Sequence, residues 1–339
     1  MDGSPVNSNQ PVASQAEERP VRLVIFGASV VSEWGNPPAT TSRAILHALT
    51  TKGHDAVFLE QRGNAPTVEL LRARGADALR DFADAYSDIR YRTYDLPEGL
   101  ERAVWLGREV STADAVVVQE GAPDAVIEDL ARFDTPRLVR LYQITGVEVP
   151  GIAARFDGIL APFGVDVPRV LTLGPALDPS ESADLPRDGV TLVAYAGQDA
   201  AQEAATALAT LEPRLISVGE VTGDRWEYLP EVRLREVYAR ARLAVVLPGS
   251  TSPLATARAL LPVAHGCPAI EVLGMGAPVF PPFGHLRSVP AAETLAAVQA
   301  ALTPGTEAGV PALAPALLAT NQALALVDLV RQRRRTQLA

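Results

Sequence analysis

The sequence predicts an α/β protein built from two Rossmann-like domains that face each other across a cleft. Short β-branched runs alternate with amphipathic segments, a β-α-β unit opens the chain, and a second series of the same kind begins near residue 191. A length of 339 residues accommodates two domains of this size. Ligands of such sheets bind at the carboxyl ends of the strands, so the loops that follow the strands are the candidate sites.

The opening β-α-β unit sets the pattern for the first domain. A strand over 22–26 leads through Gly27 into a polar loop, and Thr40 or Thr41 is expected to cap the next helix by accepting a backbone N–H. Gly53 is expected to end that helix. Further strands are predicted over 56–59, 89–94, 115–118, 137–142, 158–161 and from 170, with helices over 67–85 and from Pro97 and Pro123.

A polar segment with a proline, Ser180–Asp188, is predicted to separate the domains. The second domain is expected to hold strands over 191–195, 214–218, 244–247 and 277–280 and helices over 201–211, 234–241, 268–275 and 291–302. The predicted organisation is a disordered tail over 1–20, domains over 21–180 and 189–314, and a final helix within 315–339. Two Rossmann-like domains joined by a short hinge form the architecture called GT-B, which suits a donor in one domain and an acceptor in the other.

The composition narrows the range of partners. A net charge of −10 without a long basic block argues against nucleic acid and anionic membranes. Lys52 is the only lysine, so a bound phosphate would be held by arginine, by backbone N–H groups or by a helix N-terminus. A single cysteine, Cys267, excludes an internal disulfide and fits a reducing, cytoplasmic location. No apolar run is long enough to cross a bilayer, and residues 1–20 lack the apolar core of a signal peptide.

The segment AIEVLGMGAPV, residues 269–279, gives the strongest local signal for a ligand. We expect Glu271 on a short helix, followed by a turn with Gly274 and Gly276 and then a strand. A carboxylate can accept two hydroxyls of a ribose or sugar, and the glycines allow the backbone to approach a ligand closely. The alternative is that the glycines only permit tight packing of helix on strand.

The loop after the first strand is the second candidate. Gly35 and Asn36 could present donors to a sugar or phosphate, and Trp34 could stack on a sugar face. A plain strand-to-helix loop with Trp34 as a core anchor would fit equally. The FGAS start of this loop resembles a nicotinamide-binding loop but lacks the G-x-G-x-x-G pattern. The hypothesis of an NAD(P)-dependent oxidoreductase therefore rests on four residues alone.

Candidates for proton transfer or metal binding are few. Glu120 ends a predicted buried strand, where its carboxylate could face the cleft and act as a base, or could instead cap the helix from Pro123. His265 and Cys267 have no second pair of ligands, so no metal site is predicted. The sequence also lacks a recognisable Ser-His-Asp arrangement, an H-E-x-x-H motif and a P-loop.

The order of these motifs resembles the CgeB-like (spore-maturation type) glycosyltransferases, which are related to the GT-B glycosyltransferases of group 1. The opening loop of that family has the character S-W-G-N-G-H-A-T-T, and this chain has SEWGNPPATT over 32–41. AIEVLGMGAPVF resembles the family motif L-F-E-A-A-A-C-G-T-P-I, and EVYARA, residues 236–241, resembles the helix before the Pro-Ser loop. The similarity extends over most of residues 22–330.

This resemblance implies a metal-independent sugar transfer from a nucleoside-diphosphate sugar to a small-molecule, glycan or protein acceptor, with no cofactor and with the C-terminal helix packing back on the first domain. The donor would contact Gly197, Arg258, Glu271, Gly274, Met275, Gly276 and Ala277, with Arg287 as another cation. The acceptor would contact Ser29, Trp34, Gly35, Asn36 and Thr40. Homo- or hetero-oligomers are both compatible with the sequence.

Three departures from the family pattern keep a non-catalytic binding or partner subunit as the alternative. The Gly-His pair of the first loop is Pro37-Pro38 here, and Gln143 lies in a run where the family often has acidic residues. The paired glutamates of group 1 enzymes require a glutamate eight residues before Glu271, and that position is Val263. An epimerase on the same fold is a further alternative that no catalytic histidine or acidic pair marks.

Overall fold

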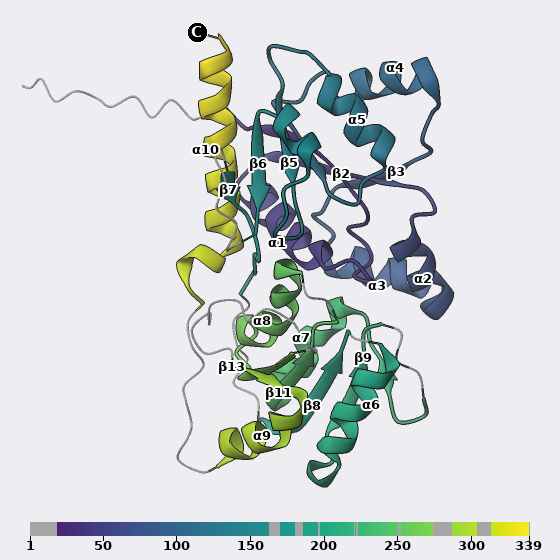
Figure 1. The fold of residues 1–339 in the computed structure, drawn as a ribbon, viewed down its shortest axis with the longest axis vertical. Coiled ribbons are helices and arrows are strands. Elements are labelled where there is room, and N and C mark those ends of the chain that lie inside the picture. The colour runs from purple at the N-terminus through teal and green to yellow at the C-terminus, as the bar shows by residue number, and fades with distance from the viewer. Residues whose placement is uncertain are drawn as a thin grey trace, which may run out of the picture.

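The computed structural model describes residues 19–162, 170–179, 186–195, 197–219, 221, 223–249, 252–273, 287–303 and 313–338. These residues form two parallel sheets, one above the other in Figure 1, with helices on both faces of each. The predicted architecture of two Rossmann-like α/β domains is confirmed.

The first sheet has seven parallel strands in the order β3-β2-β1-β4-β5-β6-β7. The strands are β1 Arg22–Gly27, β2 Asp55–Gln61, β3 Tyr91–Tyr94, β4 Ala115–Gln119, β5 Val139–Gln143, β6 Gly158–Ala161 and β7 Val170–Thr172. The helices between them are α1 Pro38–Thr51, α2 Ala65–Arg74, α3 Asp77–Ala85, α4 Gly99–Val110 and α5 Asp124–Arg132.

The second sheet has six parallel strands in the order β10-β9-β8-β11-β12-β13. They are β8 Asp188–Ala194, β9 Arg214–Ser217, β10 Glu227–Tyr228, β11 Ala241–Leu247, β12 Ala269–Leu273 and β13 Arg287–Pro290. The helices of this domain are α6 Gln198–Ala207, α7 Leu234–Arg240, α8 Thr256–Ala264 and α9 Thr294–Leu302.

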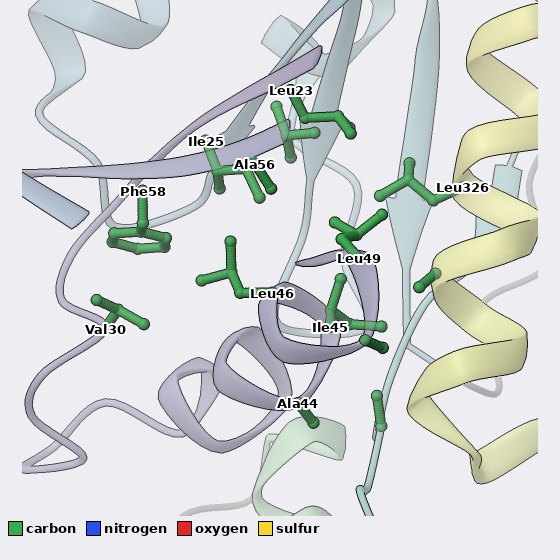
Figure 2. Close-up of a cluster of buried hydrophobic side chains, with 14 of the residues drawn as sticks. Leu23, Ile25, Val30, Ala44, Ile45, Leu46, Leu49, Ala56, Phe58 and Leu326 are labelled. Atoms are coloured by element: carbon green, nitrogen blue, oxygen red, sulfur yellow. The ribbon is translucent and has the colours of Figure 1, made fainter. Parts of the chain in front are cut away.

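The alternation of side chains along β1 explains why helices cover both faces of the first sheet. Leu23 and Ile25 belong to a core cluster on the side of α1, while Val24 and Phe26 belong to a second cluster on the side of α4 and α5. Figure 2 shows the first cluster, in which Leu46 of α1 points up to the sheet. A strand buried on both faces is an uninterrupted apolar run, which is the pattern that identified β1 and β4 in the sequence.

The last helix, α10 Ala319–Leu338, returns to the first domain as predicted. It runs along the edge of that domain in Figure 1, and its Leu326 lies in the same buried cluster as Ile45 and Leu49 of α1 (Figure 2). Just before the helix, Leu318 pairs with Leu177 in a parallel bridge. The chain therefore crosses between the domains twice.

Three local predictions are wrong. The helix expected over 67–85 is broken into α2 and α3 at Gly75, which has φ +64°. Neither Thr40 nor Thr41 caps α1, because the helix already begins at Pro38 and both threonines lie inside it. The helix expected over 268–275 is strand β12, which pairs with β11 on one side and β13 on the other. The strand expected over 277–280 lies outside the described residues.

Candidate functional site

The loop between β1 and α1 is held in place by its own polar side chains. Ser29 Oγ accepts hydrogen bonds from the backbone N–H groups of Val31 (3.2 Å) and Ser32 (3.1 Å). The amide of Asn36, a predicted acceptor contact, donates to the carbonyls of Ser29 (2.7 Å) and Ser32 (2.8 Å). Asn36 is buried, and both of its amide hydrogens are used inside the loop.

Arg43 of α1 fastens this loop to the helix. Its Nε donates to the carbonyl of Val30 at 2.8 Å, and Nη2 donates to the carbonyl of Val31 at 2.7 Å and to Glu33 Oε2 at 2.8 Å. Nη1 reaches Glu231 of the second domain at 3.2 Å. One guanidinium therefore joins the first loop, its own helix and the opposite domain.

Glu231 provides the contact from the second domain. Both of its carboxylate oxygens accept from Thr40 Oγ1 at 2.8 Å, and Oε2 also accepts from the hydroxyl of Tyr195 at 3.0 Å. Its backbone N–H donates to Glu33 Oε1 at 2.9 Å. Thr40, a predicted acceptor contact, is thus part of the join between the domains.

Arg258, a predicted donor contact on α8, lies in the same join. Nη1 donates to the carbonyl of Pro248 at 2.7 Å, and Nη2 donates across the domain boundary to the carbonyl of Glu33 at 2.6 Å. The guanidinium lies over the ring of Tyr195, 4.5 Å from its centroid. In this structure the cation expected at a phosphate is bonded within the protein.

Glu33, Arg43, Glu231 and Arg258 form what we call the interdomain charge cluster. None of the four residues is more than 4% exposed, and two carboxylates balance two guanidiniums. Burial alone would lower the pKa of Arg43, but the carboxylates of Glu33 and Glu231 outweigh it and raise that pKa. For Arg258 burial dominates and lowers the pKa, although an arginine still carries its charge at neutral pH.

Trp34 and Gly35 lie at the edge of this cluster. The ring of Trp34 packs against Tyr228 of β10 with centroids 5.9 Å apart, and the Arg74 guanidinium covers Tyr228 at 5.0 Å. Trp34 is therefore a contact between domains. Gly35 has φ +58° and open space where a side chain would be, so its backbone faces outward.

Glu120, the candidate base, follows β4 at the same edge of the first sheet. Its Oε2 accepts from the backbone N–H (2.8 Å) and hydroxyl (2.7 Å) of Thr145. The carbonyl of Thr145 in turn accepts from Ser252 Oγ of the second domain at 2.6 Å. The alternative that Glu120 caps the next helix is wrong, since α5 has Pro123 at its N-cap and no side-chain cap.

Glu271 lies in strand β12 and not on a helix. Its Oε2 accepts from Ser288 Oγ on β13 at 2.6 Å, and burial raises the pKa of its carboxyl group. The helix, glycine turn and proline that were expected around and after Glu271 come before it. Helix α8 ends at Ala264, Gly266 has φ +76°, and Pro268 precedes β12.

The order of helix, glycine and proline in the motif is therefore found before residues 269–279, in α8, Gly266 and Pro268. In L-F-E-A-A-A-C-G-T-P-I the glutamate stands five residues before the glycine, and five residues before Gly266 is Leu261. The only charged residue in the α8 sequence is Arg258. Gly274, Met275, Gly276 and Ala277 lie outside the described residues, so their expected donor contacts remain predictions.

The remaining candidates are more exposed or belong to the core. Gly197 is the N-cap of α6, and Arg287 is exposed at the start of β13. Burial lowers the pKa of His265 to about 4, and burial raises the pKa of Cys267 to about 12. In the described part of the chain no three His, Cys, Asp or Glu residues gather where they could hold a metal ion. No helix of that part is long and apolar enough to cross a membrane.

Sequence reasoning missed Arg43 and Glu231, the two centres of the cluster. One signal for Arg43 was available, because it interrupts the apolar side of a helix whose neighbours Ala39, Ile45 and Leu46 are all core residues. Glu231 carried no signal, since it lies in a short turn after β10.

No described protein family matches this sequence, and no curated protein matches it. Solved structures do match it in shape. The pneumococcal O-GlcNAc transferase GtfA, solved with UDP and GlcNAc, has a TM-score of 0.61 at 9% identity over 93% of this chain and 99% of its own. An α-glucosyltransferase solved with UDP and DNA has a TM-score of 0.53 at 9% identity, covering 94% of both chains. This chain has the GT-B fold.

The same architecture also includes an enzyme of another class. The UDP-GlcNAc 2-epimerase of Methanocaldococcus jannaschii, solved with UDP-GlcNAc and UDP, has a TM-score of 0.52 at 9% identity over 93% of this chain and 100% of its own. At such identities the GT-B fold is shared while the reaction is not thereby determined.

Proposed function

We propose that the chain is a GT-B glycosyltransferase that takes its sugar from a nucleoside diphosphate. The observation that carries the proposal is the shared architecture of two parallel sheets in two domains. This architecture matches 99% of the chain of a transferase solved with UDP and GlcNAc. The resemblance of the first loop to the CgeB-like subgroup supports the same reaction.

The donor would lie at the carboxyl edge of the second sheet, near Gly197 and Glu271. Glu271 lies in the middle of β12, where its buried carboxylate already accepts one hydroxyl, from Ser288, and a sugar or ribose hydroxyl is the same kind of donor. Arg258 would stabilise the diphosphate as the bond to the sugar breaks. The acceptor would lie on the opposite side, near Gly35 and Thr40.

The proposal requires the domains to move apart. Thr40 donates to Glu231 and Arg258 donates to the carbonyl of Glu33, so neither can contact a substrate until these two bonds between the domains open. Hinge opening around ligands is a common motion of two-domain proteins.

A non-catalytic partner or glycan-binding subunit is the second candidate. It is favoured by Leu261, which stands where the realigned motif has its glutamate, and by the use of Arg258 to join the domains. In this reading the cluster keeps the domains closed and the protein acts through its surface.

Calorimetric titration with UDP-, GDP- and dTDP-sugars, and with NAD(P), tests these proposals. We expect one nucleotide sugar to bind and to be turned over slowly to free sugar and nucleotide, and Glu271→Ala to weaken its binding about tenfold or more, as loss of a charged hydrogen-bond partner does. Ser288→Ala separates ligand contact from packing because it removes the internal bond and keeps the carboxylate. Arg240→Ala, an exposed change in the same domain, is the control.

Each outcome has a distinct meaning. Binding without turnover favours the partner subunit, and binding of NAD(P) alone favours an oxidoreductase. Conversion of a bound UDP-sugar into its epimer would assign the epimerase. Unchanged affinity in Glu271→Ala would remove Glu271 from the donor site.

A further inference from the structure

Helix α4 carries an apolar face that its own domain does not cover. Among the described residues, the exposed large hydrophobic side chains are Leu100, Val104, Val147 and Leu324. Leu100 is 86% exposed and Val104 is 63% exposed, one helical turn apart. Together with Pro97 and Trp105 they line an open groove of about 430 Å³.

The opposite side of α4 is fully used, so the exposure does not reflect a loosely placed helix. Leu106 and Val110 are buried in the core cluster that also contains Val24 and Phe26 of β1. Arg102 forms an ion pair with Asp129 at 2.6 Å, and Glu109 forms one with Arg92 at 2.5 Å. The helix is anchored on one face and presents the other outward.

The exposed face also carries two opposite charges. Glu101 and Arg108 line the groove, seven residues or two turns apart. Neither forms an ion pair within the part of the chain that the structure describes. Leu100, Glu101, Val104, Trp105 and Arg108 follow helical spacing and share one side of the helix.

We infer that this face, which we call the α4 face, binds a second copy of the chain as an antiparallel pair of α4 helices. A two-fold axis through the midpoint of the helix, between Val104 and Trp105, places Glu101 of each copy opposite Arg108 of the other. Val104 and Trp105 of the two copies then meet at the axis, the Glu101–Arg108 pairs lie on either side of them, and Leu100 lies just beyond Glu101 at each end. A two-fold contact requires one surface that complements itself, and a symmetric plus-and-minus pair around an apolar centre meets that requirement.

The balance of charge on the face itself argues for this occupant. A net charge of −10 disfavours an anionic membrane or nucleic acid on the face, and the charges of the face itself sum to zero. Figure 1 places α4 at the end of the first domain that lies away from the second domain. A dimer through α4 would therefore leave the strand-end loops free, and the inference does not depend on the proposed function.

Sedimentation velocity on the full chain, from about 1 to about 200 µM, tests the inference over the range of weak and moderate association. We expect a reversible dimer. Glu101→Arg and Arg108→Glu, tested one at a time, should each raise the dissociation constant about tenfold or more, because like charges then face each other at both ends. Val104→Glu should do the same, and Val147→Glu, an exposed valine elsewhere, should have no effect.

Complementary variants make the test specific. An equimolar mixture of Glu101→Arg with Arg108→Glu restores two opposite pairs, and so does the double reversal in one chain, so both should dimerise like the parent. A parent that stays monomeric throughout the range would overturn the inference. A dimer that survives the single reversals and Val104→Glu would overturn it as well, since its interface would lie elsewhere. Circular dichroism of each variant confirms that the fold is unchanged.

Discussion

Four buried glutamates of this protein fall into two groups that solve the same problem in opposite ways. Glu33 and Glu231 share the guanidinium of Arg43 and connect the two domains. Glu60 and Glu271 lie in strands of separate sheets and are held by neutral donors of their own domain, the N–H of Val30 at 2.9 Å and the hydroxyl of Ser288 at 2.6 Å. All four are almost inaccessible to solvent.

The difference lies in what faces each carboxylate, a cation or a neutral donor. Two carboxylates raise the pKa of Arg43 and keep this guanidinium charged, while burial raises the pKa of Glu231 although Arg43 opposes that shift. Burial raises the pKa of Glu60 and of Glu271, so these sites are pushed toward the neutral acid. Of these four carboxylates, the two where the domains meet face cations, and the two within a domain face neutral hydrogen-bond donors.

Removal of the shared cation should have the largest effect. Arg43→Ala leaves two buried carboxylates without their shared cation and the carbonyls of Val30 and Val31 without this donor, and we expect a loss of about 3–5 kcal/mol of unfolding free energy. Chemical denaturation followed by circular dichroism measures it. Arg132→Ala is the matched control, because its pair with Glu128 at 3.2 Å is exposed and should contribute about 0–1 kcal/mol. Equal losses for the two variants would mean that the buried cluster contributes no more to stability than an exposed ion pair.

Removal of the contact from the second domain should come next. Glu231→Ala leaves Arg43 paired with Glu33 but frees Thr40 and Tyr195, and we expect a loss of about 3 kcal/mol. Because each sheet has its own core clusters, the domains should also separate, so calorimetry should show two transitions where the parent shows one. Glu227→Ala, in an exposed pair with Arg214, is the control. A single transition in Glu231→Ala would mean that other contacts hold the domains together.

The fold could be predicted from the sequence because its signals are local. The apolar runs of β1 and β4 and the end of α1 just before Gly53 follow from the spacing of nearby residues. The failure at β12 has a physical cause, since AIEVL is too short a run to show a helical or a strand period. Its state is decided by pairing with β11 and β13, which the local sequence does not contain.

The candidate site could be predicted only in part, because its main contacts are distant in the sequence. Arg43 and Glu231 are 188 residues apart, and no spacing rule connects them. Thr40 and Arg258 were singled out as substrate contacts, and the structure brings both to the domain boundary, where each is bonded to the opposite domain. Sequence reasoning therefore identified residues that lie at the domain boundary, but not the hydrogen bonds that they form there.

The smallest expected effect concerns Glu60 of the second group, whose carboxylate is buried without a cation. Glu60→Gln keeps an oxygen to accept from Val30 and removes the buried charge, so it should be more stable than the parent at neutral pH by on the order of 1 kcal/mol, the scale of one hydrogen bond. A carboxyl whose pKa is raised on folding contributes its stability below its ordinary value of 4.5 and loses it as the pH rises through the folded pKa. The advantage of Glu60→Gln should therefore shrink as the pH falls toward 4.5. Denaturation at several pH values measures this trend, with the exposed Glu98→Gln as a control that should show none. An advantage of Glu60→Gln that grows toward acid pH would mean that Glu60 is held in the charged state.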